Sequence, residues 1–582
     1  MNSKTKDYSQ LSQEQLIEII NQLEKKQEYG LVWDAERVPE QVVEDCKTKL
    51  PVLVEDKTKR IQKSDDDLTH ILIEGDNYHA LSTLAYTHAG KIDLIYIDPP
   101  YNTGSKDFKY NDKFIDKIDT FRHSKWLQFM SKRLEIAYSL LKDEGVMFIS
   151  INEDEYANLK LLCDKLFFDI NYMTTFTVKV RHEDRILKGD KDFHEVVEYM
   201  LMYRKSSEFK TIKRIYDNTS NDQYLYKITE LDDSPDILEC GKKSVKVFKP
   251  EQFKIEKCEP SETNLKVINI RGSIKEGNSS GRFFMKYLEK FIGTNLGYLF
   301  KVPDMGDDGL GYRYFYVSDK ASRANGDYFQ GVPTDRKEIK EVPYSNFLDF
   351  ESDFNNVGYE GGVEFRNGKK PLRFLDHILT MGGIKLNKDA IILDFFAGSG
   401  STGNAVLNLN MTDEGRRQFI LCTNNENNIA EEITHKRIQK VIEGYGDNQP
   451  KPANLRYYKT DFVENIKNKA QLKINITWSC TEMLCIKEGV FELLKENNSW
   501  KIFKQGGRVM AVYYDFNQDD LESLKSEIIG NSEFANCTIT LYQFCQNANG
   551  FSDSNLLQWE ENGIILKPIP QKILDIYDQL YK

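Results

Sequence analysis

The sequence predicts an α/β protein: a doubly wound, Rossmann-like sheet interrupted by a long insertion. Short apolar segments alternate with helical patterns in residues 67–204 and again in residues 365–464. Such alternation is typical of a mainly parallel sheet with helices packed against it. Residues 205–364 lack this rhythm and are polar and loop-rich. At 582 residues the chain is long enough for roughly two to four domains.

Composition and rhythm divide the chain into five predicted segments. They are an N-terminal helical extension (1–66), the first part of the sheet (67–204), the insertion (205–364), the second part of the sheet (365–464) and a small α/β appendage (465–582). In the extension, apolar residues at helical spacing predict a helix over residues 10–29. Its apolar face suits either dimerisation or packing within one chain.

The overall composition disfavours several classes of protein. The formal net charge is −12, which argues against a protein that coats nucleic acid non-specifically but still allows a local basic cleft. The nine cysteines are scattered without a zinc-type spacing, so we expect reduced thiols and no metal site. No apolar run reaches the roughly 20 residues of a membrane span, and the first residues are polar. We therefore expect a cytoplasmic location and no membrane partner.

A turn with chemical potential follows the predicted strand over residues 91–97. This strand ends at Asp98-Pro99-Pro100, because proline has no N–H for a ladder and a fixed φ. Open α/β sheets bind ligands at the carboxyl ends of their strands. Asp98 and carbonyl oxygens without ladder partners can accept the N–H groups of a planar amine, and the ring of Tyr101 can stack on its base. An ordinary strand exit with a capping aspartate is the alternative.

The run Asp98-Pro99-Pro100-Tyr101 resembles the catalytic motif of DNA amino-methyltransferases, which methylate an exocyclic amine of adenine or cytosine. Its continuation, Asn102-Thr103-Gly104, is similar to that of the permuted, β-class adenine enzymes. These include the Mod subunits of Type III restriction–modification systems. The resemblance implies catalytic roles for Asp98, Pro99, Pro100 and Tyr101.

A glycine loop follows a second apolar strand, which ends at Asp394. Gly398 and Gly400 allow close approach to the backbone, and no lysine follows to make a nucleotide P-loop. The run 394–402 resembles the S-adenosylmethionine loop of the same methyltransferases. It implies cofactor contacts from Asp394, Phe395, Phe396, Ala397, Gly398, Gly400 and Thr402.

Two more strand ends are candidates for cofactor binding. Asp76 and Asn77 follow the strand 69–74, where Asp76 suits an adenosine amine or ribose hydroxyl, and either residue also suits a helix N-cap. Thr423, Asn424 and Asn425 follow the strand 418–423, in the place that usually supplies the ribose contact. This tip departs from the commoner acidic one. We expect Asn424 or Asn425 to hold the ribose, and helix capping is the alternative.

The order of the motifs, with the catalytic strand before the cofactor loop, resembles the permuted β-class arrangement. The resemblance implies site-specific methylation of the adenine N6 amine in double-stranded DNA, with base flipping and S-adenosylmethionine as cofactor. It also implies a homodimer, sequence recognition by residues 205–364 and a separate restriction subunit with helicase and nuclease activity. The alternatives are a methyltransferase outside restriction, a non-catalytic DNA-binding subunit, and enzymes acting on RNA, protein or cytosine. The role of residues 465–582 is not indicated.

Overall fold

The computed structural model describes residues 33, 39–184, 193–232, 234–270, 279–317, 326–365, 369–463, 469–514, 518–543, 559 and 561–568. These residues form two compact units. The smaller unit is Lys213–Tyr344, and the larger unit contains the described residues on both sides of it in sequence. The helix predicted over residues 10–29 lies outside the described residues.

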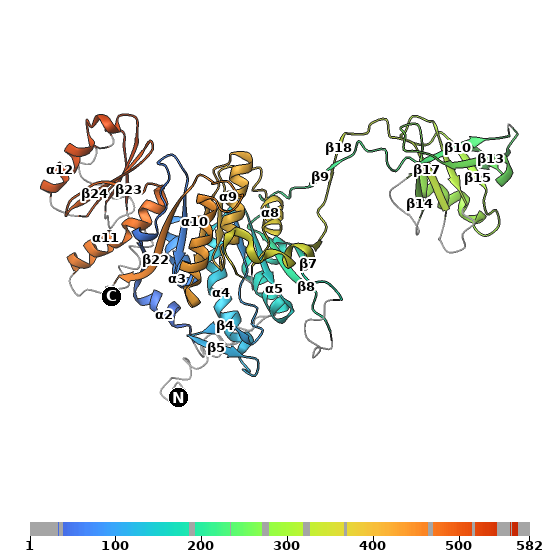
Figure 1. The fold of residues 1–582 in the computed structure, drawn as a ribbon. Helices are drawn as coiled ribbons and strands as arrows, with labels where there is room; N and C mark the ends of the chain where they lie inside the picture. Colours follow the sequence, from blue (N-terminus) through green and yellow to red (C-terminus); the bar gives the residue numbers. More distant parts are fainter. Residues whose placement is uncertain are drawn as a thin grey trace, which may run out of the picture. The chain divides into compact units, whose positions relative to one another are not determined.

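A mixed sheet of ten strands, counted over the described residues, is the centre of the larger unit (Figure 1). In order across the sheet, the strands are β1 (Leu50–Glu55), β22 (Asn454–Val463), β2 (Thr69–Glu74), β21 (Gln418–Thr423), β20 (Ile391–Asp394), β3 (Ile92–Ile97), β6 (Leu141–Ile151), β8 (Val197–Arg204), β7 (Tyr172–Lys179) and β19 (Phe347–Asp349). All neighbours from β22 to β6 are parallel. The two predicted parts of the sheet therefore interleave, with β20 and β21 lying between β2 and β3.

The helices of the larger unit pack on both faces of this sheet. They are α2 (Gln41–Thr48), α3 (Asn77–Thr87), α4 (Arg122–Leu140), α5 (Glu153–Phe167), α7 (Glu351–Asn355), α8 (Leu372–Met381), α9 (Ser401–Asp413), α10 (Lys436–Glu443), α11 (Lys469–Glu488) and α12 (Gln518–Ile528). Strand β3 shows the division, because successive side chains point to opposite faces. Ile95 and Ile97 share a core with α3, α4 and α5. The ring of Tyr96 instead meets Phe374 of α8 edge to face. This is the doubly wound arrangement expected from the sequence.

The sheet extends further than the predicted segments. Residues 50–55, which we assigned to an N-terminal extension, form β1 and pair antiparallel with β22. Residues 347–349, which we assigned to the insertion, form β19 and pair parallel with β7. Both additions are edge strands with few residues, so their own sequences give only a weak strand signal. None of the described helices is long and apolar enough to cross a lipid bilayer.

The smaller unit is built on an antiparallel sheet. Its strands, in order across the sheet, are β11 (Asp236–Cys240), β12 (Lys243–Phe248), β15 (Leu299–Pro303), β16 (Tyr312–Tyr316), β17 (Gly326–Gln330) and β14 (Lys266–Ile270). One face packs on α6 (Ser279–Phe283) and the turn after it. The other packs on the pair β10 (Tyr226–Glu230) and β13 (Phe253–Lys257), and β9 (Arg214–Asp217) pairs with β18 (Ile339–Val342).

The C-terminal appendage is joined to the main core of the larger unit. Its sheet consists of β23 (Glu492–Glu496), β24 (Trp500–Gln505), β25 (Arg508–Tyr513), β26 (Thr538–Gln543) and β27 (Ile564–Pro568). On one face of this sheet, Leu524 and Ile528 of α12 are buried. On the other, Cys480 and Met483 of α11 join Met510 and the core that includes α3. Helix α11 thus connects the two sheets, as its place in Figure 1 illustrates.

Candidate active site

A cavity of about 910 Å³ lies at the carboxyl ends of β2, β21, β20 and β3. The parallel direction of these strands brings their four end turns to one edge of the sheet. The lining includes most of the residues predicted from the sequence: Asp76, Asn77, Asp98, Pro99, Pro100, Asp394, Phe395, Phe396, Ala397, Gly398, Thr402, Thr423 and Asn424. Three predicted residues, Tyr101, Gly400 and Asn425, do not line it.

Asp98 is held by a cluster of polar side chains just after β3. Its Oδ1 accepts a 2.7 Å hydrogen bond from the hydroxyl of Tyr101, and the ammonium group of Lys370 lies 3.2 Å from the same oxygen. Lys370 also contacts Glu198 at 2.8 Å. Burial raises the pKa of the Asp98 carboxyl above its usual range, and the nearby Lys370 opposes this rise. The site thus holds a buried carboxylate between a cation and a hydroxyl.

The turn after Asp98 is fixed by contacts to α4 and α5. The indole Nε1 of Trp126 donates a 2.7 Å hydrogen bond to the carbonyl of Pro100. Asn102 is fully buried with a φ of 57°, a conformation that asparagine tolerates better than most residues. Its amide donates to Glu155 at 2.5 Å. These contacts leave the carbonyl of Pro99, within the cavity wall, as the other backbone acceptor beside Asp98.

The loop after β20 forms the facing wall. Gly398 has a φ of 48° and Gly400 a φ of 75°, both in the left-handed region that favours glycine. A Cβ at Gly398 would meet nothing closer than 3.8 Å, so open space lies beside this residue. A Cβ at Gly400 would instead lie 3.0 Å from the side chain of Thr434, which explains why Gly400 packs inside and not on the cavity.

Asp394 closes the bottom of the same loop. Its carboxylate accepts hydrogen bonds from the hydroxyl of Thr402 (2.6 Å) and from the backbone N–H of Phe396 (3.0 Å). Burial raises the pKa of Asp394 to about 7, although both hydrogen bonds act in the opposite direction. The group therefore titrates near neutral pH within the cavity wall.

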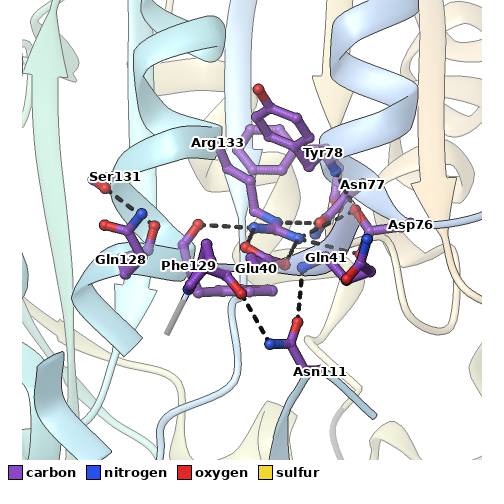
Figure 2. A network of polar contacts seen from close by, with 12 residues as sticks. Glu40, Gln41, Asp76, Asn77, Tyr78, Asn111, Gln128, Phe129, Ser131 and Arg133 are labelled. Atoms are coloured by element: carbon purple, nitrogen blue, oxygen red, sulfur yellow. Dashed lines mark hydrogen bonds and ion pairs between the residues drawn. The ribbon is translucent and has the colours of Figure 1, made fainter. Parts of the chain in front are cut away.

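A network centred on Arg133 holds the turn after β2 (Figure 2). The guanidinium is fully buried and pairs with Glu40 at 2.7 Å and with Asp76 at 3.1 Å, and it also donates to Asn77. Asp76 in addition accepts from the N–H of Tyr78 and is the N-cap of α3. The capping interpretation therefore describes Asp76, which also keeps 40% of its side chain exposed where the cavity lies.

The end of β21 differs from the prediction in one residue. The side-chain oxygen of Asn425 accepts hydrogen bonds from the N–H groups of Ala430 and Glu431, which is the capping alternative. Asn424 and Glu426 line the cavity instead. A turn in which Asn427 and Asn428 both have positive φ directs the chain this way. The acidic group missing from the strand tip is thus supplied by Glu426.

A hairpin between β3 and α4 forms another part of the cavity wall. It consists of β4 (Ser105–Tyr110) and β5 (Lys113–Asp116). Its Lys109 pairs with Glu426 at 2.9 Å, and the side chain of Asn111 bonds the backbone at Pro39 and Gln41 (Figure 2). The hairpin thereby links the ends of β3 and β21 to the start of α2.

Sequence reasoning missed the charged partners of the site. Glu40, Arg133, Glu198 and Lys370 come from α2 and its N-cap, α4, β8 and the start of α8. Each stands in a stretch whose pattern indicates only an amphipathic helix or a strand. The single usable signal was the pair Lys369-Lys370 directly before Pro371, since two lysines at a buried helix start are unusual.

The comparisons with known proteins identify the class. A family model described as DNA methylase, N6_N4_Mtase, matches residues 92–435, which is more than half of the chain. The protein therefore belongs to this DNA methylase family. The match spans both the turn at Asp98 and the glycine loop at Gly398, the two walls of the cavity.

The curated relatives include subunits of Type III restriction–modification enzymes. The StyLTI Mod subunit of Salmonella typhimurium is 29% identical over 438 residues, which cover 69% of this chain and 61% of that protein. The EcoPI Mod subunit of Escherichia phage P1 is 28% identical over 524 residues, with coverage of 80% and 76%. The probable HindVI Mod subunit of Haemophilus influenzae is 30% identical over 426 residues, with coverage of 64% and 51%. The resemblance to Mod subunits is confirmed, although the chain spans less than two thirds of the StyLTI and HindVI proteins.

Proposed function

We propose that this protein transfers a methyl group from S-adenosylmethionine to the N6 amine of adenine at a specific sequence in double-stranded DNA. The observation that carries the proposal is the position of Asp98-Pro99 and the loop 395–398 at the ends of two adjacent parallel strands, β3 and β20, in the wall of one cavity. An amine acceptor and a cofactor loop must lie this close for direct methyl transfer.

Asp98 and Pro99 are the proposed acceptors for the target amine. The amino group of adenine is a weak nucleophile, because its lone pair is delocalised into the ring. Hydrogen bonds from its two N–H groups to the carboxylate of Asp98 and the carbonyl of Pro99 would localise this pair. Lys370 and burial keep Asp98 in a fixed electrostatic environment, so the gain comes from orientation and preorganised charge. Stacking of the base on Tyr101 stays a prediction, since its hydroxyl is engaged with Asp98.

The residues around the glycine loop fit S-adenosylmethionine. Open space beside the Cα of Gly398, together with its left-handed φ, suits close approach of the amino-acid end. Asn424 or Glu426 would hold the ribose, and Asp76 would accept the adenosine amine. When bound, the cofactor supplies the methyl group as a sulfonium. The carboxylates of Asp394, Asp98 and Glu426 give this cavity the negative charge that a cationic ligand needs.

The target base must leave the helix to reach Asp98, whose side chain is only 21% exposed. Flipping a paired base costs a few kcal/mol. We propose that the smaller unit, Lys213–Tyr344, supplies sequence recognition, because it interrupts the sheet and the cavity lining lies outside it. Its sheet has two separate cores and forms a folded module by itself.

The proposal extends to partners. By similarity to the Mod subunits, we infer that the protein is a homodimer and acts with a restriction subunit. A methyltransferase outside restriction remains the second candidate, because M.KpnI, a Type II methyltransferase from Klebsiella pneumoniae, is also 28% identical over 398 residues. Light scattering at micromolar concentration tests the dimer, and a monomer there contradicts it.

Long-read modification sequencing tests the proposed function. DNA without modification is incubated with the purified protein and S-adenosylmethionine, and a reaction with the Asp98→Ala variant serves as the control. We expect N6-methyladenine at one sequence in the first reaction only. Methylated cytosine, or no modification above that of the variant, contradicts the proposal.

A further inference from the structure

Asp98 belongs to a buried cluster whose other members come from distant parts of the chain. Lys370 precedes α8, and Glu198 lies on β8. The ammonium of Lys370 donates 2.8 Å hydrogen bonds to the Tyr101 hydroxyl and to Glu198 Oε2. The Tyr101 hydroxyl in turn lies 2.7 Å from Asp98 Oδ1 and 3.0 Å from Glu198 Oε2. Four polar groups thus share one set of short contacts.

The two oxygens of Asp98 are not equivalent in this cluster. Both the Tyr101 hydroxyl and the Lys370 ammonium are directed at Oδ1. No hydrogen bond to Oδ2 is found within the described part of the chain, yet Asp98 lines the cavity. A carboxylate held at one oxygen cannot turn freely, so the direction of its other oxygen is fixed.

We propose that Lys370 and Glu198 are positioning residues, which together with Tyr101 fix one oxygen of Asp98 so that the other accepts the amine of the target base. This inference deepens the proposed function and rests on it. Neither lysine nor glutamate needs to touch the base or the cofactor. Their action is through Asp98.

Glu198 has a separate part in this arrangement. A lysine with Asp98 as its sole anionic partner would neutralise the carboxylate and compete with the target amine for it. Glu198 gives Lys370 a closer partner, at 2.8 Å against 3.2 Å for Asp98. The cation therefore orients Asp98 without being centred on it, and the Glu198 anion balances its charge.

The position of Lys370 is itself fixed by its neighbours in sequence. The ammonium of Lys369 is surrounded by the carbonyls of Gly358, Glu360 and Val363 at 2.8, 3.1 and 2.7 Å. Pro371 follows and starts α8. Lys370 is 9% exposed and therefore has few alternative positions for its side chain. A rigid backbone on both sides makes it suitable for positioning another group.

The charges that surround Asp98 make the proposal testable by pH. Lys370 favours its ionised form, whereas Glu198 disfavours it; Tyr101 and Tyr96 are neutral hydroxyls nearby, and Asp394 is the next carboxyl. Arg181 acts on Glu198 from the other side. Removing Lys370 should therefore raise the pKa of Asp98, and removing the charge of Glu198 should lower it.

The experiment measures single-turnover methyl transfer from pH 5.5 to 9 for wild type, Lys370→Met, Lys370→Arg and Glu198→Gln. With Lys370→Met we expect the acidic limb of the profile to move to higher pH by roughly one to three units. The rate at pH 7 then falls about tenfold for each unit. With Glu198→Gln the limb should move to lower pH, and Lys370→Arg should keep the wild-type limb because the charge remains.

A matched control is Lys142→Met. Lys142 pairs with Asp93 at 2.7 Å at the amino end of the same strand β3, so it tests the loss of a lysine–aspartate pair away from the cavity. We expect its profile to equal that of wild type. Purely structural roles for Lys370 and Glu198 would slow transfer without opposite shifts of the limb, and that result overturns the proposal.

Two further readouts keep failures distinguishable. Cofactor affinity by calorimetry reports whether each variant is folded, and a Lys370→Met protein that binds no cofactor leaves Glu198→Gln to decide: a limb at the wild-type pH or above it overturns the proposal. Wild-type protein that methylates no DNA contradicts the proposed function instead. The positioning of Asp98 is then measured by carbon NMR titration of its carboxyl, where the same opposite shifts are expected and their absence overturns it.

Discussion

The ammonium of Lys370 donates a 2.8 Å hydrogen bond to the hydroxyl of Tyr101, a residue 269 positions earlier in the chain. Tyr101 belongs to the turn after β3, and Lys370 lies beside α8, which packs on the opposite face of that strand from α4. The contact joins the two sequence segments that the smaller unit separates. The cavity is therefore complete only when both segments have folded into one sheet.

Asp98→Ala should abolish methyl transfer and leave cofactor binding within about tenfold of wild type. The loss should reach at least about 10²-fold, a typical cost of removing one preorganised hydrogen-bonding group from an active site. Lys370 keeps Glu198 as its partner in the variant, so the cluster should not collapse. Rapid-quench transfer measures the first effect and calorimetry the second. Parallel loss of cofactor binding would assign Asp98 to the cofactor instead.

Gly398→Val should weaken cofactor binding strongly, because its side chain would enter the space beside the glycine loop. Gly446→Val is the matched control. Gly446 has a similar φ of 54°, and a Cβ there also meets nothing within 4 Å, but it lies outside the cavity lining. The backbone strain is thus similar in both variants. An equal dissociation constant for both, measured by calorimetry, would rule out a cofactor site at this loop.

The two walls of the cavity were predictable because their signals are local. An apolar strand that ends in Asp98-Pro99-Pro100, or in a glycine loop after Asp394, fixes its own geometry within a few residues. The partners were not predictable in this way. Lys370 and Glu198 have sequences that suit an exposed surface, and only long-range packing buries them. At Asn425, the strand end was located correctly, but the direction of the following turn decided that Glu426 lines the cavity.

Arg133→Met should destabilise the larger unit by about 3–5 kcal/mol, since it leaves the buried carboxylate of Glu40 without its cation. Burial already raises the pKa of Glu40, which indicates a costly environment for an isolated charge. Lys47→Met removes an exposed pair with Glu44 on the same helix α2 and should cost less than about 1 kcal/mol. Urea unfolding measures both. Similar small losses would show that Arg133 is not a structural centre.

Asp394 should make the protein without cofactor less stable as pH rises toward 7. Its pKa in the folded state is about 7, above the ordinary value near 4, so the folded state retains a proton that the unfolded state releases. The stabilising contribution is complete below pH of about 4 and is lost as pH rises through about 7, by on the order of a few kcal/mol. Asp394→Asn should lack this loss. Urea unfolding at pH 5 to 8 compares the slopes, and identical slopes contradict the assignment.

Exchange of the smaller unit should change the methylated sequence and leave the methylated base as adenine. Lys213–Tyr344 folds around its own two cores, and every residue of the cavity lining lies outside it. Arg313, a residue whose type suits base contacts, is buried and paired with Asp308 at 2.8 Å, so the contacts must come from other side chains such as the exposed Lys242.

Each good side-chain pair to a base edge contributes roughly 1–3 kcal/mol of discrimination, so a few suffice to define a site. The chimera carries residues 213–344 of a relative, and modification sequencing gives its site while calorimetry gives its cofactor affinity. We expect a new sequence with unchanged affinity. Wild-type affinity together with the original sequence would place recognition in the larger unit, where the C-terminal appendage is the next segment to exchange.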